Sequence, residues 1–164
     1  ALAAAAFASF TIDRGSADGV QPDMAVIAPQ GVVGRIIGPV ASRASRVQLI
    51  IDRNAAVGAI VERSRAGGMV VGVEGDPPLR MDLASNLADI VKGDVIVASG
   101  VDGIYPKGFI IGTVDRSERG KNLYRDVTIR PAVNFAGLEE VLIVMVPARG
   151  AQIEEPQKPK EAAK

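Results

Sequence analysis

The residues best suited to chemistry in this chain are one serine and two lysines. Ser99 lies in VASGVDG, where a strand would end at a glycine turn, and Lys92 and Lys107 are near it in sequence. A serine nucleophile needs a base, and lysine can supply one where histidine is lacking. The chain has no histidine and no cysteine, which excludes Ser-His-Asp and Cys-His arrangements and metal sites built on those ligands. A serine that ends a strand is the favoured interpretation, and a lysine-assisted serine hydrolase is the weaker alternative.

The other glycines and carboxylates predict no catalytic pair, cofactor or metal. GGMVVGVEG, at 67–75, lacks GxGxxG spacing and runs into two prolines instead of a helix. Asp13, Asp18 and Asp23 lie five residues apart, whereas an EF-hand places ligands at every second residue. Glu139 and Glu140 are adjacent and would point to opposite faces of a strand. We therefore expect no enzyme activity.

The charge balance argues against a general polyanion binder. The chain has 19 basic and 19 acidic residues, and aromatics make up 4%. A small-barrel nucleic-acid binder, which needs a positive field and stacking platforms, is therefore a weak alternative. One arginine-rich stretch could meet an anionic partner or form a solvated face; its members are Arg35, Arg43, Arg46, Arg53, Arg63 and Arg65.

Short runs rich in Val and Ile predict an all-β fold with two small barrel-like domains. Gly, Pro, Asp or Asn ends each run, and the intervals are too short for interleaved helices. After the leader, only 85–91 has helical spacing. The expected strands are 7–12, 25–28, 32–40, 46–51, 56–62, 69–74, 79–83, 94–98, 109–116, 124–133 and 138–146.

The sequence Asp76-Pro77-Pro78 predicts a domain boundary, because proline removes backbone donors and restricts the residue before it. We expect a leader over 1–6, a first β module over 7–76 and a second over 77–147, with room for the modules to interleave in space. Residues 148–164 have little apolar content and should be a disordered tail.

Two segments repeat a pattern of glycine and proline. TIDRGSADGVQPDMAV with GVVGRII, over 11–37, is echoed by VKGDVIVASGVDGIYPKGFIIGTV, over 91–114. In each, a glycine stands three residues before a proline and a glycine pair follows, as turns and barrel corners require. Duplication and convergent turn chemistry both explain the echo. The expected turn and corner residues are Gly19, Pro22, Gly31, Gly34, Gly100, Gly103, Pro106, Gly108 and Gly112.

Four residues are candidates for an interface with a partner. Tyr105 lies at a turn and Phe135 near a loop, so both could be exposed aromatic anchors. The alternative is an aromatic ring folded back onto its own turn. Arg43 and Arg46 are the candidates from the arginine-rich stretch.

Five segments in matching order, over about 10–146, resemble the MreC family of rod shape-determining proteins. They are TIDRGSADGVQPDMAV, GVVGRII, SRASRVQLIID, VKGDVIVASGVDGIYPKGFIIGTV and PAVNFAGLEEVLIV. The resemblance implies a bacterial envelope protein with a cytoplasmic tail, a membrane helix, a coiled coil and two periplasmic β domains, one likened to chymotrypsin-type barrels. This chain would be the periplasmic part. Residues 1–6 would remain from the coiled-coil side, and the N-terminal anchor would lie outside the chain.

The resemblance also implies a function. The chain would be a non-enzymatic scaffold of the cell-elongation machinery, on the periplasmic side of the inner membrane, that organises peptidoglycan synthesis and self-assembles as a dimer or filament. The implied partners are the elongation transpeptidase of the penicillin-binding class, the membrane protein MreD and, across the membrane, the actin-like MreB. Ala98 departs from the threonine that the family often has before Ser99 and Gly100.

Overall fold

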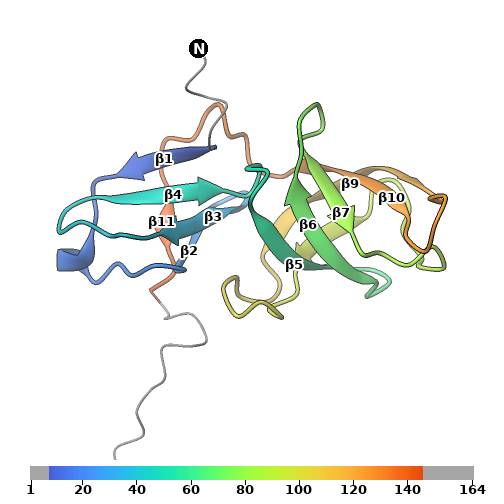
Figure 1. The fold of residues 1–164 in the computed structure, drawn as a ribbon, viewed down its shortest axis with the longest axis horizontal. Helices are drawn as coiled ribbons and strands as arrows, with labels where there is room; N and C mark the ends of the chain where they lie inside the picture. The colour runs from blue at the N-terminus through green and yellow to red at the C-terminus, as the bar shows by residue number, and fades with distance from the viewer. Residues whose placement is uncertain (1–7, 146–164) are drawn as a thin grey trace, which may run out of the picture.

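The structure, a computed structural model, describes residues 8–145 and confirms the all-β prediction. An antiparallel sheet in the order β1-β4-β3-β2-β11 lies beside a closed antiparallel barrel in the order β10-β7-β6-β5-β8-β9 (Figure 1). The sheet contains β1 (Ser9–Ile12), β2 (Ala25–Ala28), β3 (Gly31–Ile37), β4 (Ser45–Leu49) and β11 (Leu142–Ile143), with the 3₁₀-helix η2 (Ser16–Asp18) between β1 and β2. The barrel contains β5 (Ala56–Val61), β6 (Gly67–Gly72), β7 (Leu79–Asp82), β8 (Val95–Ala98), β9 (Ile110–Glu118) and β10 (Asp126–Pro131).

The predicted boundary at 76 and 77 is wrong. Strands β5 and β6 precede it, yet they pair with β7 and β8 inside the barrel. The chain passes from sheet to barrel between β4 and β5, and β11 returns to the sheet after the barrel is complete. Asp76-Pro77 lies in the turn between β6 and β7, where Gly72 already pairs with Leu79. A proline pair interrupts a sheet in a hairpin turn as well as at a domain boundary.

The helical spacing over 85–91 forms no helix, because the backbone turns there and Ser85 bridges Tyr124 across the end of the barrel. The expected leader, over 1–6, and the tail, over 148–164, lie outside the described residues.

Aliphatic side chains fill two packed cores that meet between the sheet and the barrel. Val26, Val33, Ile36 and Val47 are among the fully buried residues of the sheet core. The barrel core is formed from all six of its strands, and it also takes in Ala25 and Val32 from the sheet. The two units therefore form one packed body.

The glycine echo corresponds to a repeated β-bulge. Val33 is an extra residue of β3 opposite β2, and Ile111 is an extra residue of β9 opposite β8. A glycine follows each bulge at once, Gly34 in the sheet and Gly112 in the barrel. A Cβ on either glycine would meet a carbonyl oxygen of the next strand, at 1.9 Å for Gly34 and 2.2 Å for Gly112. The two glycines thus occupy equivalent places in two similar strand pairs.

The Gly-x-x-Pro turns, by contrast, are not equivalent. The turn with Gly19 and Pro22 comes before β2, whereas the turn with Gly103 and Pro106 lies between β8 and β9. Of the residues in the repeated pattern, only the glycines that follow the bulges, Gly34 and Gly112, occupy equivalent positions in the structure. Among the other expected turn residues, Gly19, Gly100, Gly103 and Gly108 have positive φ in turns, and Gly31 lies where β3 touches the backbone of Ile110.

Candidate functional site: a groove between two sheet edges

A groove of about 870 Å³ lies between the two edge strands of the five-stranded sheet. Residues 9–14, on and after β1, form one wall, and residues 138–143, leading into β11, form the other. Each edge strand pairs with one neighbour only, β1 with β4 and β11 with β2. The sheet therefore resembles a barrel left open along one seam, with backbone groups of β1 and β11 facing the gap.

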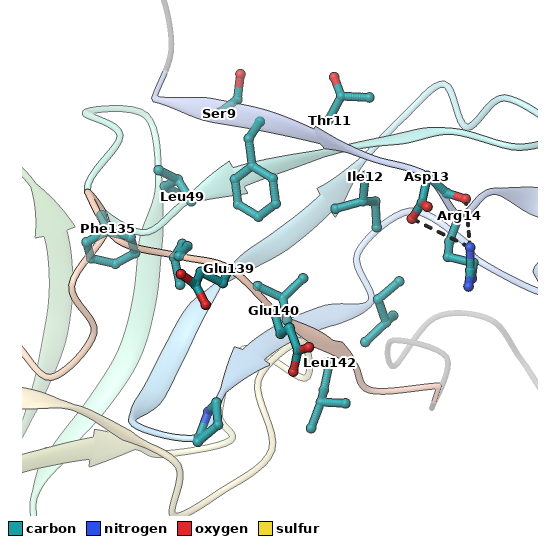
Figure 2. Close-up of a pocket in the computed structure, with 15 residues that line it drawn as sticks. Ser9, Thr11, Ile12, Asp13, Arg14, Leu49, Phe135, Glu139, Glu140 and Leu142 are labelled. Atoms are coloured by element: carbon teal, nitrogen blue, oxygen red, sulfur yellow. Dashed lines mark hydrogen bonds and ion pairs between the residues drawn. The ribbon is translucent and has the colours of Figure 1, made fainter.

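The groove has an apolar floor. Figure 2 shows Ile12 directed from β1 into the groove, while Ser9 and Thr11 lie on the other side of the strand. Phe10 and Ile12 pack partly against the sheet core, as do Phe135, Leu138, Val141 and Ile143 from the opposite wall. Leu142 is 62% exposed. A concave apolar strip between two strand edges can accept an extended polypeptide.

The rim of the groove is acidic. Asp13, Glu139 and Glu140 line it, and Arg14 is the basic residue among its lining residues. Arg14 lies 3.5 Å from the Asp13 carboxylate (Figure 2), so the two glutamates set the charge of the β11 side. Their adjacent positions in the sequence argued against a catalytic acid and base pair. Nothing in the sequence indicated that the two glutamates border a groove.

Tyr105 is not an exposed anchor, and that expectation is wrong. Its side chain is 2% exposed within the barrel core. Asp102 folds the loop inward: its Oδ1 accepts hydrogen bonds from the N–H groups of Ile104, at 3.0 Å, and Tyr105, at 3.2 Å, and its Oδ2 accepts one from Gly58, at 2.9 Å. Burial raises the pKa of the Tyr105 phenol well above its ordinary value. The signal that was missed is the aspartate three residues before the tyrosine.

Phe135, the other candidate anchor, lines the groove and is half-buried against both cores. Arg43 and Arg46 are exposed at the N-terminal end of β4, and neither forms an ion pair among the described residues. Arg46 borders a smaller hollow with Thr11 and Ile37. These three residues therefore do not form one surface.

The arginine-rich stretch does not form a continuous cationic face. Acids distant in sequence bind three of its members: Asp23 binds Arg35, Glu74 lies 3.1 Å from Arg53, and two aspartates bind Arg63. Spacing along the chain could not show these pairs, because 12 to 31 residues separate the partners.

Ser99 has the geometry of a turn residue. Its Oγ accepts a hydrogen bond from the N–H of Val101 at 3.3 Å, and its own N–H donates to the carbonyl of Gly58 at 2.9 Å. Among the hydrogen bonds of the described residues, neither Lys92 nor Lys107 reaches the hydroxyl. The site that the hydrolase alternative requires is therefore not assembled around Ser99.

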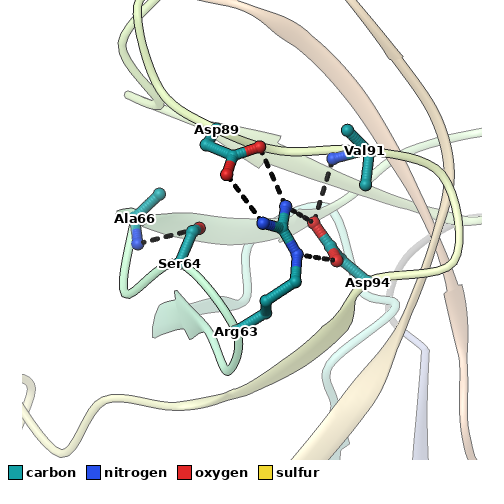
Figure 3. Close-up of polar contacts among 6 residues, drawn as sticks. All are labelled: Arg63, Ser64, Ala66, Asp89, Val91 and Asp94. Carbon is teal, nitrogen blue, oxygen red and sulfur yellow. Dashed lines mark hydrogen bonds and ion pairs between the residues drawn. The ribbon is translucent and has the colours of Figure 1, made fainter.

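Arg63 forms a polar latch, defined here as Arg63, Asp89 and Asp94, that the sequence did not reveal (Figure 3). Its guanidinium donates to both oxygens of Asp94 at 2.9 Å and to the two oxygens of Asp89 at 2.6 and 2.9 Å. Asp94 is 7% exposed and also accepts the N–H of Val91 at 2.9 Å. The latch ties the loop after β5 to the loop before β8. Hydrogen bonds from Arg63 lower the pKa of both carboxyl groups, more than their desolvation raises it.

The latch predicts a stability difference that disappears in acid. Because the folded-state pKa values of Asp89 and Asp94 lie below the ordinary 3.8, the latch stabilises the fold above that pH and loses its effect as the pH falls below it. We expect Arg63→Gln to unfold at lower urea concentration than the wild type at pH 7, and the gap to close in strong acid. Arg53→Gln, which removes a single exposed pair, is the matched control and should change little. A gap that persists unchanged in strong acid would contradict the latch.

Residues 8–145 contain no cluster of three potential metal ligands among His, Cys, Asp and Glu. In the same range, no helix is long and apolar enough to cross a membrane.

A closed barrel packed on an open, groove-bearing sheet defines a class of two-part β proteins, and the comparisons with known proteins give the family. The model of the rod shape-determining protein MreC, barrel core, matches residues 3–145. The chain belongs to the MreC family. The cell shape-determining protein MreC of Listeria monocytogenes is 31% identical over 139 residues, which cover 81% of this chain and 46% of the relative. The chain thus spans less than half the length of that relative.

Solved structures agree with the family assignment. An MreC structure from Listeria monocytogenes matches with a TM-score of 0.79 and 30% identity, over 88% of this chain and 71% of that one. An MreC from Helicobacter pylori, solved in complex with the penicillin-binding protein PBP2, matches with a TM-score of 0.59 and 20% identity, over 68% of each chain. At that identity the second match concerns the fold alone.

Proposed function

We propose that this chain is a non-enzymatic scaffold of the cell-elongation machinery, and that the groove between β1 and β11 binds a penicillin-binding-class transpeptidase. The groove is the observation that carries the proposal, because it joins two unpaired strand edges to an apolar floor. Membership of a cell shape-determining family supports the cellular role. The existence of a complex between the Helicobacter pylori MreC and PBP2 supports the class of partner.

The geometry favours an extended partner segment that adds to an exposed edge. Main-chain hydrogen bonds to β1 or β11 would supply affinity, and alternate side chains would enter the apolar floor beside Phe135 and Ile12. The acidic rim favours basic residues next to the apolar ones, because opposite charges speed association and exclude wrong partners. Phe135 would then act as a half-buried anchor.

A charge placed in the groove should weaken this binding. Leu142 is 62% exposed on β11, so Leu142→Arg should leave the fold intact and lower affinity for the soluble part of the transpeptidase by about tenfold or more. Val101→Arg is the control, because Val101 is 82% exposed on a barrel loop outside the groove. Isothermal titration calorimetry would measure the affinity of both variants for the transpeptidase. Equal losses for the two variants, or none for Leu142→Arg, would reject the groove as the binding site.

The remaining assignments follow from the family. We infer a periplasmic location beside the inner membrane with an N-terminal anchor, contact with MreD, cooperation with MreB across the membrane, and self-association. Arg43 and Arg46, both exposed, remain candidates for these contacts. Pull-down with MreD and light scattering of the isolated chain would test two of these inferences. Labelling of Ser99 by a serine-directed covalent probe would overturn the non-enzymatic assignment.

A further inference from the structure

The barrel tip presents the most exposed leucine side chain of the described residues. We define the tip as the loops 83–93 and 119–125, which meet at the end of the barrel away from the five-stranded sheet (Figure 1). Leu87 is 86% exposed and Leu123 is 76% exposed. Leu83, Val91 and Tyr124, also on these loops, are each about half exposed. Large apolar side chains gathered on one surface indicate an interaction site.

Asn86 holds the two loops in a fixed arrangement. Its side-chain oxygen accepts the N–H of Gly120 at 3.0 Å, and its amide nitrogen donates to the carbonyls of Gly120, at 3.1 Å, and Asn122. Its backbone N–H donates a hydrogen bond to the carbonyl oxygen of Leu123 at 2.9 Å. Leu87 follows Asn86 in the chain, and Leu123 accepts its backbone hydrogen bond. The two loops are thus already held in place, so a binding partner would not have to order them first.

The tip is cationic beside its leucines. Arg119, Lys121 and Arg125 lie in the second loop, which has no acid between them. In the first loop the Asp89 carboxylate is held by Arg63, together with Asp94 (Figure 3). One guanidinium faces two carboxylates, so the latch keeps a net charge of −1, and Glu118 and Asp126 flank the second loop, with Asp126 3.7 Å from Arg116. The basic side chains of the two loops outnumber this remaining negative charge; they are Lys92, Arg119, Lys121 and Arg125.

We propose that the barrel tip docks on an anionic phospholipid bilayer. Leu87 and Leu123 would enter the boundary between headgroups and acyl chains, and Arg119 and Lys121 would lie at the level of the lipid phosphates. Tyr124 would take the interfacial position that its amphipathic ring favours. Leu87 and Leu123 are highly exposed and lie outside the groove between β1 and β11, which suits a peptide. The tip shares no residue with the groove lining, so docking there does not depend on the groove or its partner.

Vesicle co-sedimentation of the full chain tests the proposal. At low salt the protein should bind vesicles of equal parts phosphatidylglycerol and phosphatidylcholine more tightly than phosphatidylcholine alone. The double variant Leu87→Ser with Leu123→Ser should lower the partition coefficient at least about tenfold. Arg119→Gln with Lys121→Gln should lower it about fivefold for each charge removed, and should remove the preference for phosphatidylglycerol.

Two matched double variants serve as controls. Val101→Ser with Ile110→Ser removes exposed apolar side chains elsewhere, and Arg43→Gln with Arg46→Gln removes exposed charges elsewhere. Both should bind vesicles as the wild type does. The proposal is wrong if the wild type fails to bind at low salt, or if tip and control variants lose binding equally. It is also wrong if the tip variants bind vesicles normally but lose the transpeptidase, which would make the tip a protein interface.

Discussion

Replacing Tyr105 with alanine should lower the free energy of unfolding by about 3–5 kcal/mol, as truncation of a large buried aromatic ring does. The ring is 2% exposed and belongs to the barrel core, together with Ala25 and Val32 from the sheet. The charges of Arg35 and Asp23, from the sheet unit, act on the Tyr105 phenol and influence its pKa, so the cavity would open close to where the two units meet. Chemical denaturation followed by circular dichroism would measure the loss.

A second pair of variants separates the ring from the loop that carries it. Tyr105→Phe keeps the ring and should cost much less than Tyr105→Ala. Asp102→Ala should cost about 2 kcal/mol, because three N–H groups that the carboxylate accepts lose their partner. If Tyr105→Ala is as stable as Tyr105→Phe, the ring does not carry the junction between sheet and barrel.

The fold class was predictable from the sequence because it depends on local patterns. Runs of Val and Ile between turn residues gave strands close to those observed, for example 25–28 for β2 and 94–98 for β8. The grouping of these strands was not predictable, because hairpin turns and domain boundaries use the same residues. Pro77 and Pro78 illustrate this, since they lie in the turn between the end of β6, at Gly72, and the start of β7, at Leu79.

The candidate site was harder to predict because its parts are far apart in sequence. The groove joins residues 9–14 to residues 138–143, and only the return of β11 to the sheet brings them together. The latch joins Arg63 to aspartates 26 and 31 residues away. Neither arrangement has a characteristic spacing. The prediction that Tyr105 is exposed was wrong for another reason. It rested on the position of Tyr105 in a turn, but hydrogen bonds to Asp102 fold that turn inward.

The glycine echo is the sequence feature with the most direct structural cause. In both strand pairs an extra residue twists the backbone, and the glycine after it lets the next strand approach. The short apolar stretch before each glycine is then the bulge itself, with Val33 and Ile111 turned into the two cores. The same local device shapes both the open sheet and the closed barrel.

Replacing Gly34 with alanine should destabilise the fold by about 3 kcal/mol, because the new methyl group would overlap backbone and not a movable side chain. A Cβ there would stand 1.9 Å from the carbonyl oxygen of Gln48, so β3 and β4 would have to separate. Gly67→Ala is the matched control: Gly67 is also in a strand, its nearest such neighbour is 3.9 Å away, and alanine should be neutral or slightly stabilising. Thermal and urea unfolding would compare the two, with Gly112→Ala expected to behave as Gly34→Ala. Equal stability of the Gly34 and Gly67 variants would show that the strands after the bulge can move apart without loss.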